Sequence, residues 1–372
     1  MRRIVFITQA IDPASTVLGV TRDWVAALAE RCGGVDVIAL SAAPSGAAGG
    51  ERWSNVRAVS LGKERGASKR AQLVAFYRAL AVALPRSSAI FVHMVPRYAL
   101  LAYPLALVAG RPLALWYAQG GVGASLQLAA RLASWILTPT RDSFPLSGRR
   151  IDRRVIVTGH GIDTHRFAPN GSVPATNGAG SSAAREGPPR RLLAAGRLSP
   201  SKRYDLLLEA LAALPDREWR LRIAGGPLSG SDRAYAARLR ARATQLGLAG
   251  CVAFGGFVPY AEMAAEYRAA WALAHTSATG SLDKVVLEAM ACGTPVVSSA
   301  PTSRAALGPL AEELWCPAER PDAVAARLAA ALSWTPARRG ELGAALRREV
   351  EQHHSLPRWA DRVAGLLLAG RP

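Results

Sequence analysis

Short apolar runs alternate with longer amphipathic segments along the first part of the chain. Runs of four to six apolar residues are typical of strands buried on both faces, whereas the longer segments are typical of helices packed on a sheet. We expect a helix at Arg22–Arg31 and strands at Ile4–Thr8, Val35–Leu40, Ala89–His93, Leu113–Tyr117, Trp135–Thr138 and Val155–Thr158. This rhythm predicts an α/β domain with a parallel sheet flanked by helices.

The alternation stops at residues 169–190, which contain many Gly, Pro, Ser and Ala and almost no large apolar side chain, and then starts again. Such a segment buries too little surface to offset the ordering of its backbone, so we expect a flexible linker. Beyond it we expect strands at Arg191–Ala195, Trp219–Ala224, Val252–Phe254, Ala272–His275 and Pro295–Ser299, and helices at Ser201–Leu214, Ala234–Leu246, Tyr260–Ala270 and Asp283–Cys292. The tail from Pro321 to Gly370 is expected to form two or three helices.

The chain therefore reads as two doubly wound, Rossmann-like α/β domains facing a central cleft, where the strand carboxyl ends would hold ligands. The predicted boundaries are residues 1–168 for the N-terminal domain, 169–190 for the linker and 191–350 for the C-terminal domain. Residues 351–372 are expected to form a helix that packs back on the N-terminal domain. A length of 372 residues with 50% hydrophobic and 20% charged residues agrees with two compact domains and excludes wholesale disorder.

The N-terminal sequence MRRIVFITQA is soon interrupted by Gln9 and Asp12, so it predicts a first strand rather than a signal peptide. The most apolar stretch, Ala99–Ala118, contains two prolines and an arginine and would make a poor membrane-spanning helix. The four cysteines have no metal-binding spacing, which favours free thiols in a reducing compartment. We expect a cytoplasmic protein of bacterial composition.

The formal net charge is +19, and residues 1–168 carry most of it, with 21 Lys and Arg against 9 Asp and Glu. This excess indicates either an anionic partner or no more than solubilising charge combined with compositional drift towards Arg. No nucleic-acid-binding motif accompanies it, so we expect no nucleic acid partner. An anionic acceptor or the inner face of a membrane fits better, with contact through the stretch Gly62–Arg70 (GKERGASKR).

Two segments of the second domain carry candidate chemistry. The turn Gly196–Lys202 (GRLSPSK) follows a predicted strand and precedes a predicted helix with Ser201 as its N-cap, and a helix N-terminus favours an anion. Arg197 and Lys202 flank this turn, so both side chains could converge on a diphosphate; an ordinary solvated basic turn is the alternative. Lys202 is one of only four lysines, which favours a functional role.

The second segment, Gly280–Pro295 (GSLDKVVLEAMACGTP), predicts a helix capped by Asp283 or Ser281. Glu288 lies about one turn into that helix, where a carboxylate could hold a ribose diol through two hydrogen bonds. Its alternative is a surface ion pair with Lys284, which contributes only ~0.3 kcal/mol.

In order and spacing, the segments GRLSPSKRYDLLLEAL, LRIAGGP, VAFGGFVP and TGSLDKVVLEAMACGTPVVSS resemble the donor half of retaining glycosyltransferases of the GT4 type, which have the GT-B fold. The segments ITQAIDPASTVLG, FVHMVP, WYAQGG and VTGHGIDTHRF are similar to the acceptor half of that family. The resemblance covers nearly the whole chain.

The resemblance implies catalytic roles for Arg197 and Lys202, which would stabilise the leaving diphosphate, and for Glu288 on the ribose. It implies donor-binding roles for Gly19, Gly196, Gly225, Gly226, Phe257, Gly280, Ser281, Leu282, Asp283, Lys284 and Val285. It implies acceptor-binding roles for His93, Arg97, Gln119 and Gly120. For His93, a buried structural histidine is the alternative.

The chain departs from the family at two positions. Gly280 replaces the first Glu of the paired-Glu motif, as in a subgroup with a GSxDK sequence, so Asp283 would contact the sugar hydroxyls instead. Gln119 stands where the family often has His, and an amide cannot titrate near neutral pH.

The resemblance predicts a retaining glycosyltransferase that moves a sugar from a nucleoside diphosphate sugar to an acceptor hydroxyl or amine. A UDP-sugar is favoured over a GDP- or dTDP-sugar, and no cofactor or metal is expected. The acceptor would be a small molecule, a glycan or a lipid-linked sugar. The alternatives are a non-catalytic sugar-nucleotide-binding protein and a sugar-nucleotide epimerase or phosphorylase with the same fold.

Overall fold

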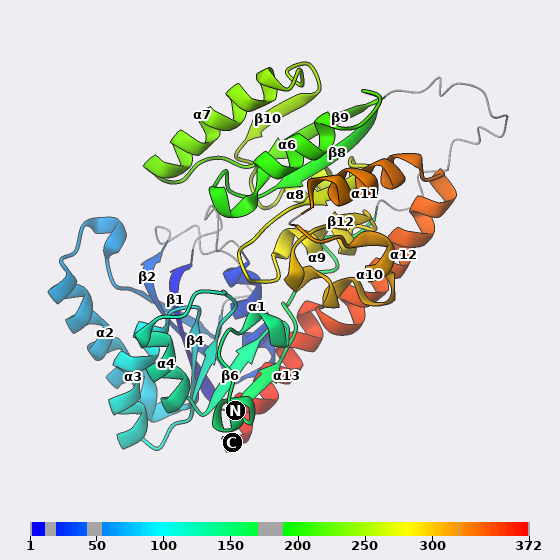
Figure 1. The fold of residues 1–372 in the computed structure, drawn as a ribbon. Coiled ribbons are helices and arrows are strands. Elements are labelled where there is room, and N and C mark those ends of the chain that lie inside the picture. Colours follow the sequence, from blue (N-terminus) through cyan, green and yellow to red (C-terminus); the bar gives the residue numbers. More distant parts are fainter. Residues whose placement is uncertain (1, 12–19, 43–53, 170–188, 319, 371–372) are drawn as a thin grey trace. The chain divides into compact units, whose positions relative to one another are not determined.

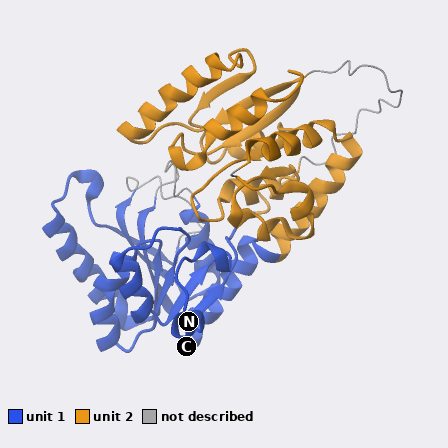
Figure 2. Cartoon of the chain, viewed as in Figure 1, with its two compact units in different colours: residues 1–163, 353–372 blue, residues 164–352 orange. Residues whose placement is uncertain are grey.

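The computed structural model describes residues 2–11, 20–42, 54–169, 189–318 and 320–370. The chain divides into two compact units, shown in Figure 2: unit 1 comprises residues 1–163 and 353–372, and unit 2 comprises residues 164–352. Most of the predicted linker 169–190 lies outside the described residues, and so does Gly19.

The described part of unit 1 contains a seven-stranded parallel sheet with the strand order β3-β2-β1-β4-β5-β6-β7. Its strands are β1 (Arg3–Ile11), β2 (Val35–Ala42), β3 (Val56–Ser60), β4 (Ser87–His93), β5 (Leu113–Trp116), β6 (Trp135–Thr138) and β7 (Val155–Val157). Strand β3 was not predicted. It forms an edge of the sheet and its middle residues are exposed, so it lacks the continuous apolar run that reveals a buried strand.

Helices cover both faces of this sheet. Helices α2 (Lys69–Ala83), α3 (Pro96–Val108) and α4 (Ala124–Leu132) pack over one face, where Val5 and Ile7 of β1 join their apolar residues in one core (Figure 1). On the other face, α1 (Thr21–Arg31) contacts α13 (Leu356–Ala369) through Trp24 and Trp359, whose rings lie 4.2 Å apart. Successive side chains of a strand point to opposite faces of the sheet, so alternate residues of β1 belong to different cores.

Unit 2 contains a five-stranded parallel sheet with the order β10-β9-β8-β11-β12. Its strands are β8 (Arg190–Ala195), β9 (Trp219–Ala224), β10 (Val252–Gly256), β11 (Ala272–His275) and β12 (Val296–Ser298). The helices that accompany them are α6 (Tyr204–Ala212), α7 (Gly230–Gln245), α8 (Met263–Arg268) and α9 (Lys284–Ala291). The chain order reverses between β8 and β11, and parallel sheets bind ligands outside the strand carboxyl ends at such a reversal. The prediction of two Rossmann-like α/β domains is confirmed.

The predicted start of the helix after β8 is wrong. We expected a helix from Ser201 with that residue as its N-cap, but residues Pro200–Lys202 form a short 3₁₀ turn and α6 begins at Tyr204. Arg203 separates the two with φ 51°, in the left-handed region that a residue with a side chain rarely adopts. The carboxyl end of β8 is therefore followed by two tight turns rather than by a direct helix N-terminus.

The tail forms α11 (Pro321–Ser333), α12 (Pro336–His353) and α13, which confirms the expected helices. The apolar stretch Ala99–Ala118 is divided between α3 and β5. Among the helices of the described residues, none combines the length and the apolar character needed to cross a bilayer.

All four cysteines are free thiols, and Cys251 is the one that is not fully buried.

Candidate functional site

Two loops meet at the strand reversal of unit 2. One follows β8 and carries Lys202, and the other follows β11 and leads to Asp283 at the start of α9. Thr276 donates its hydroxyl to the carbonyl oxygens of Lys202 (2.9 Å) and Arg203 (3.0 Å), and the amide of Ala278 donates to the carbonyl of Ser201 (2.7 Å). These bonds fix the two loops to each other, so their side chains have a defined relative position.

The centre of this site is an ion pair between Lys202 and Asp283. Lys202 Nζ lies 2.6 Å from Asp283 Oδ2, and the two side chains are only 14% and 15% exposed. His275 Nε2 lies 2.9 Å from the same carboxylate oxygen. Burial opposes ionisation of Asp283, but the Lys202 charge and the bond from His275 outweigh it and hold its pKa far below the ordinary value. Asp283 is therefore an anion with a cation held against it.

The site includes a histidine for which no functional role was predicted. His275 ends β11, and its Nδ1 lies 2.9 Å from Ser298 Oγ on the neighbouring strand β12. Ser303 Oγ lies 2.6 Å from the same hydroxyl, so a chain of polar side chains supports the ring from behind. A histidine at the carboxyl end of a buried strand was the available signal.

Asp283 occupies the N-cap position of α9, as predicted, but its side chain does not cap the helix. Its oxygens lie instead near Lys202, His275 and Thr279, whose hydroxyl is 3.4 Å from Oδ1. The carboxylate thus faces the loops of the site rather than the amides of its own helix.

Two glycines bring the backbones of β8 and β9 close together beside Lys202. A Cβ on Gly225, where φ is +149°, would lie 1.9 Å from the carbonyl oxygen of Gly196. On Gly196, where φ is +130°, it would lie 3.3 Å from Lys202 Cε. Gly226 has more room, since a Cβ there would lie 3.8 Å from the amide nitrogen of Phe257. Phe257 follows β10 and is 52% exposed, so an aromatic surface is available on this edge of unit 2.

Arg197 does not share a partner with Lys202. Its Nε lies 3.8 Å from Asp232 Oδ2, and its side chain is 49% exposed. Asp232 belongs to the capping box that Ser229 forms at the start of α7. The side chains of Arg197 and Lys202 therefore do not share a partner in this structure. The Arg197 guanidinium lies near Asp232, and the Lys202 ammonium lies near Asp283.

Glu288 lies inside unit 2. It is 4% exposed, and Tyr267 donates its hydroxyl to Glu288 Oε2 at 2.7 Å. Burial raises the pKa of Glu288, while the Tyr267 bond and the charges of Lys284 and Arg166 oppose the rise. The alternative of a surface pair between Lys284 and Glu288 is wrong, because Glu288 is buried. Burial also lowers the pKa of Lys284.

The other predicted donor residues lie between β11 and α9. Gly280 is exposed with φ +66°, Ser281 and Leu282 are buried, and Val285 is half-buried. Among the described residues, no group of three or more His, Cys, Asp and Glu side chains could hold a metal ion.

The predicted acceptor residues lie in unit 1, after the carboxyl ends of β4 and β5. Arg97, Gln119 and Gly120 are exposed. His93 is 1% exposed, its Nδ1 lies 3.1 Å from Thr8 Oγ1, and its ring packs against Trp24. The geometry of His93 is that of a buried ring in an aromatic cluster, and its acceptor role stays a prediction.

Residues 181–346 match the family model Glycosyl transferases group 1. These residues are a glycosyl transferases group 1 domain. The match contains all of the β8 and β11 loops and α9. The predicted resemblance to this family is confirmed for this domain, which carries Lys202, Asp283 and Glu288.

Curated relatives match part of the chain. D-inositol 3-phosphate glycosyltransferases are 39% identical over 154 residues in Streptomyces bingchenggensis, 42% over 153 residues in Frankia alni and 37% over 181 residues in Thermomonospora curvata. These matches cover 39%, 40% and 46% of this chain. The chain spans only 32%, 36% and 41% of the length of these relatives.

Solved structures resemble the whole chain in fold. HepE of Anabaena in complex with UDP has a TM-score of 0.75 at 17% identity and covers 99% of this chain and 100% of its own. Sucrose-phosphate synthase of Thermosynechococcus elongatus has a TM-score of 0.78 at 19% identity, with 99% of both chains covered. The prediction of the GT-B fold is thus confirmed.

Proposed function

We propose that the protein is a retaining glycosyltransferase that moves a sugar from a nucleoside diphosphate sugar to an acceptor hydroxyl or amine. The observation that carries the proposal is the buried ion pair of Lys202 and Asp283 at the strand reversal of the glycosyl transferases group 1 domain. The reversal is where a parallel sheet binds ligands, and the pair supplies both a cation for phosphate and a carboxylate for sugar hydroxyls.

In this proposal Lys202 stabilises the leaving diphosphate. Its ammonium has three donors, of which Asp283 takes one at 2.6 Å and Ser277 Oγ lies 3.4 Å away, so a further donor remains for a phosphate oxygen. A cation held in place before the reaction stabilises the charge that develops when the sugar–phosphate bond breaks, without reorganisation at that moment. Arg197 is half exposed and adds a second cation after a rotation away from Asp232.

Asp283 takes the place of the first carboxylate of the paired-Glu motif, which is Gly280 in this chain. Its low pKa keeps it ionised, so it accepts hydrogen bonds from sugar hydroxyls while it orients Lys202. Glu288 is proposed to hold the ribose diol. Because Tyr267 already donates to Oε2, Oε1 is the oxygen left for the ribose.

The acceptor is proposed to bind to unit 1 through Arg97, Gln119 and Gly120, with His93 behind them. The relatives named D-inositol 3-phosphate glycosyltransferases support an anionic acceptor, and so does the positive charge of residues 1–168. The complexes of HepE with UDP and with UDP-glucose support a UDP-sugar donor.

Retention is proposed to follow the family pattern, in which the leaving phosphate accepts the proton of the acceptor on the same face of the sugar. The acceptor oxygen or nitrogen forms its bond to the anomeric carbon as the bond to the phosphate oxygen breaks. This route uses no side-chain nucleophile and calls on no metal. The protein contributes alignment and charge stabilisation.

The stretch Gly62–Arg70 is proposed as a contact with the anionic inner face of the cell membrane. Its basic residues Lys63, Arg65, Lys69 and Arg70 are all exposed. Sedimentation with vesicles tests this contact: binding should rise with the fraction of phosphatidylglycerol and fall with salt. Binding that ignores both would contradict it.

The activity is tested by nucleotide release. The protein is incubated with UDP-, GDP- and dTDP-sugars, alone and with a panel of hydroxyl and amine acceptors that includes sugar and inositol phosphates. The proposal predicts that release of the nucleotide requires an acceptor and yields a glycosylated product with the anomeric configuration of the donor. Epimerised donor without acceptor would indicate an epimerase, and donor binding without turnover in any mixture would indicate a binding protein.

A further inference from the structure

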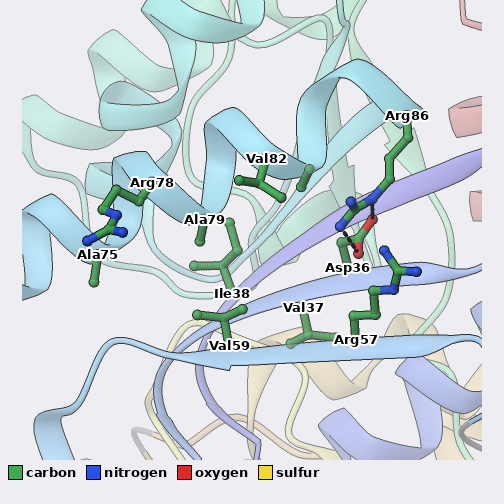
Figure 3. A pocket seen from close by; sticks show the side chains of 11 residues that line it. Asp36, Val37, Ile38, Arg57, Val59, Ala75, Arg78, Ala79, Val82 and Arg86 are labelled. Carbon is green, nitrogen blue, oxygen red and sulfur yellow. Dashed lines mark hydrogen bonds and ion pairs between the residues drawn. The ribbon is translucent and has the colours of Figure 1, made fainter.

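Unit 1 contains a pocket that none of the predicted acceptor residues lines. Its volume is about 410 Å³, and it lies between α2 and the strands β2 and β3 (Figure 3). Its size falls in the range of roughly 300–1,000 Å³ found for small-molecule sites. The lining residues are Asp36, Val37, Ile38, Arg57, Val59, Ala75, Arg78, Ala79, Val82, Ala83 and Arg86.

The walls of the pocket are apolar in the middle. Ile38 and Val59 come from the sheet, and Ala79 and Val82 come from α2, between the arginines at the two ends (Figure 3). Val59 and Val82 leave 43% and 63% of their surface exposed. Apolar side chains that stay in contact with water in a concave site gain free energy when an apolar ligand covers them.

The two ends of the pocket are cationic. Arg57 and Arg86 lie at the end where Asp36 is found, and Arg78 lies at the other end (Figure 3). Within the described ranges, neither Arg57 nor Arg78 forms an ion pair or a side-chain hydrogen bond, and both are exposed. Three arginines and one aspartate thus line the pocket, with Arg78 at the end opposite to Asp36.

The carboxylate of Asp36 is already paired with two arginines. Asp36 accepts from Arg3 Nε at 2.9 Å and from Arg86 Nη2 at 3.0 Å, and each arginine donates a second hydrogen bond to it. Burial raises the pKa of Asp36, but the bonds from Arg86 and Arg3 lower it below its ordinary value. Since Arg3 and Arg86 together exceed its single charge, Asp36 has nothing left to neutralise Arg57.

The charged end of the pocket that contains Asp36 lies near the amino ends of the strands, whereas the predicted acceptor residues follow the carboxyl ends. Asp36 and Arg57 are near the amino ends of β2 and β3, and Arg86 directly precedes β4. The predicted acceptor residues follow the carboxyl ends of β4 and β5. A ligand in the pocket would therefore not meet the residues of unit 1 that are proposed to bind the acceptor.

We propose that this pocket binds a single-chain amphiphilic anion of the fatty-acid type. The head group lies against Arg57, whose planar guanidinium group matches a carboxylate, next to Arg86, which is bound to Asp36. The alkyl chain runs between Ile38, Val59 and Val82 towards Arg78. The inference is independent of the glycosyltransferase activity. The occupant is a monomeric amphiphile taken from solution, because an apolar trough closed by cations at both ends suits a chain of limited length.

Equilibrium dialysis with radiolabelled dodecanoate below its micellar concentration tests the proposal. Wild-type protein should bind one molecule saturably, and should bind acetate and dodecyl maltoside at least tenfold more weakly, since each lacks one half of the ligand. Arg57→Glu, which reverses a cationic end, and Ala79→Trp, which fills the middle, should each weaken dodecanoate binding at least tenfold. Arg153→Glu, at an exposed arginine outside the pocket, should leave it unchanged.

Several results would overturn the proposal: no saturable binding to the wild-type protein, equal binding of dodecyl maltoside, or loss of binding in Arg153→Glu to the same extent as in Arg57→Glu. Binding to phosphatidylglycerol vesicles without binding to monomeric dodecanoate would also overturn it and would point to a membrane surface. Because Arg57 is exposed, Arg57→Glu should fold even if Ala79→Trp does not. UDP binding by the same variants should match the wild type, which separates this test from that of the proposed function.

Discussion

Lys202 Nζ lies 2.6 Å from Asp283 Oδ2, and this contact joins the loop after β8 to the start of α9. Each group is largely buried, so removal of one leaves the other as an uncompensated charge. We expect Lys202→Ala and Asp283→Ala each to lower the free energy of unfolding, by about 1–3 kcal/mol. The double variant should lose less than the sum of the two.

Urea denaturation of the wild type, both single variants and the double variant measures this coupling. Lys69→Ala, at an exposed lysine in unit 1, is the matched control and should be neutral. Strict additivity of the two single effects would show that the pair contributes nothing to unit 2.

Much of this site could be predicted from the sequence because its residues lie on loops that follow buried strands. Lys202 comes soon after an apolar run, and Asp283 precedes an apolar helix, so both fall on the carboxyl edge of the sheet. His275 also lies at the carboxyl end of a predicted strand, but its side-chain partner on the neighbouring strand could not be predicted. Its link to Ser298 depends on the pairing of β11 with β12, which puts these two residues in register, and no local pattern carries that information.

The errors of prediction have equally local causes. Ser201 has the side chain of a good N-cap, but the left-handed backbone at Arg203 moves the helix start to Tyr204. Strand β3 was missed because its middle residues are exposed at an edge of the sheet, so it lacks the run of apolar residues that distinguishes a buried strand from a loop. The burial of Glu288 against Tyr267 required the packing of α8 on α9, since the two residues are 21 positions apart.

Glu288→Ala should weaken donor binding if the carboxylate holds the ribose. The same change leaves the buried hydroxyl of Tyr267 without its acceptor, so it should also lower stability by about 1–3 kcal/mol. Tyr267→Phe breaks the same hydrogen bond but keeps the carboxylate. Calorimetric titration with a UDP-sugar should therefore show a higher Kd for Glu288→Ala and a Kd near the wild-type value for Tyr267→Phe. Equal affinity in all three proteins would contradict the ribose role.

Gly225→Ala should disrupt the close approach of β8 and β9. The added Cβ would lie 1.9 Å from the carbonyl oxygen of Gly196, and the positive φ adds backbone strain. We expect a loss of at least ~2 kcal/mol in stability together with weaker UDP binding. Gly226→Ala is the control, because its Cβ would meet its nearest neighbour at 3.8 Å. Thermal unfolding compares the two, and a stable Gly225→Ala variant would show that this approach is not required.

His354 should make the stability of unit 1 depend on pH. Its burial, reinforced by the charge of His353, lowers its pKa from 6.5 to about 4. The unfolded chain therefore binds the proton first, so stability is complete above pH 6.5 and falls as the pH decreases towards 4, by ~3 kcal/mol in total. The difference in unfolding free energy between wild type and His354→Asn, measured from pH 7.5 to 4, isolates this group. Parallel curves for the two proteins would exclude it.

In the proposed function, Lys202 binds the diphosphate of a nucleotide sugar in the glycosyl transferases group 1 domain. Isothermal titration of UDP and a UDP-sugar into wild-type protein, Lys202→Ala and Lys69→Ala tests it directly. We expect saturable binding to the wild type, at least a tenfold higher Kd for Lys202→Ala, equivalent to ~1.4 kcal/mol, and an unchanged Kd for Lys69→Ala. Wild-type affinity in a folded Lys202→Ala variant would contradict it.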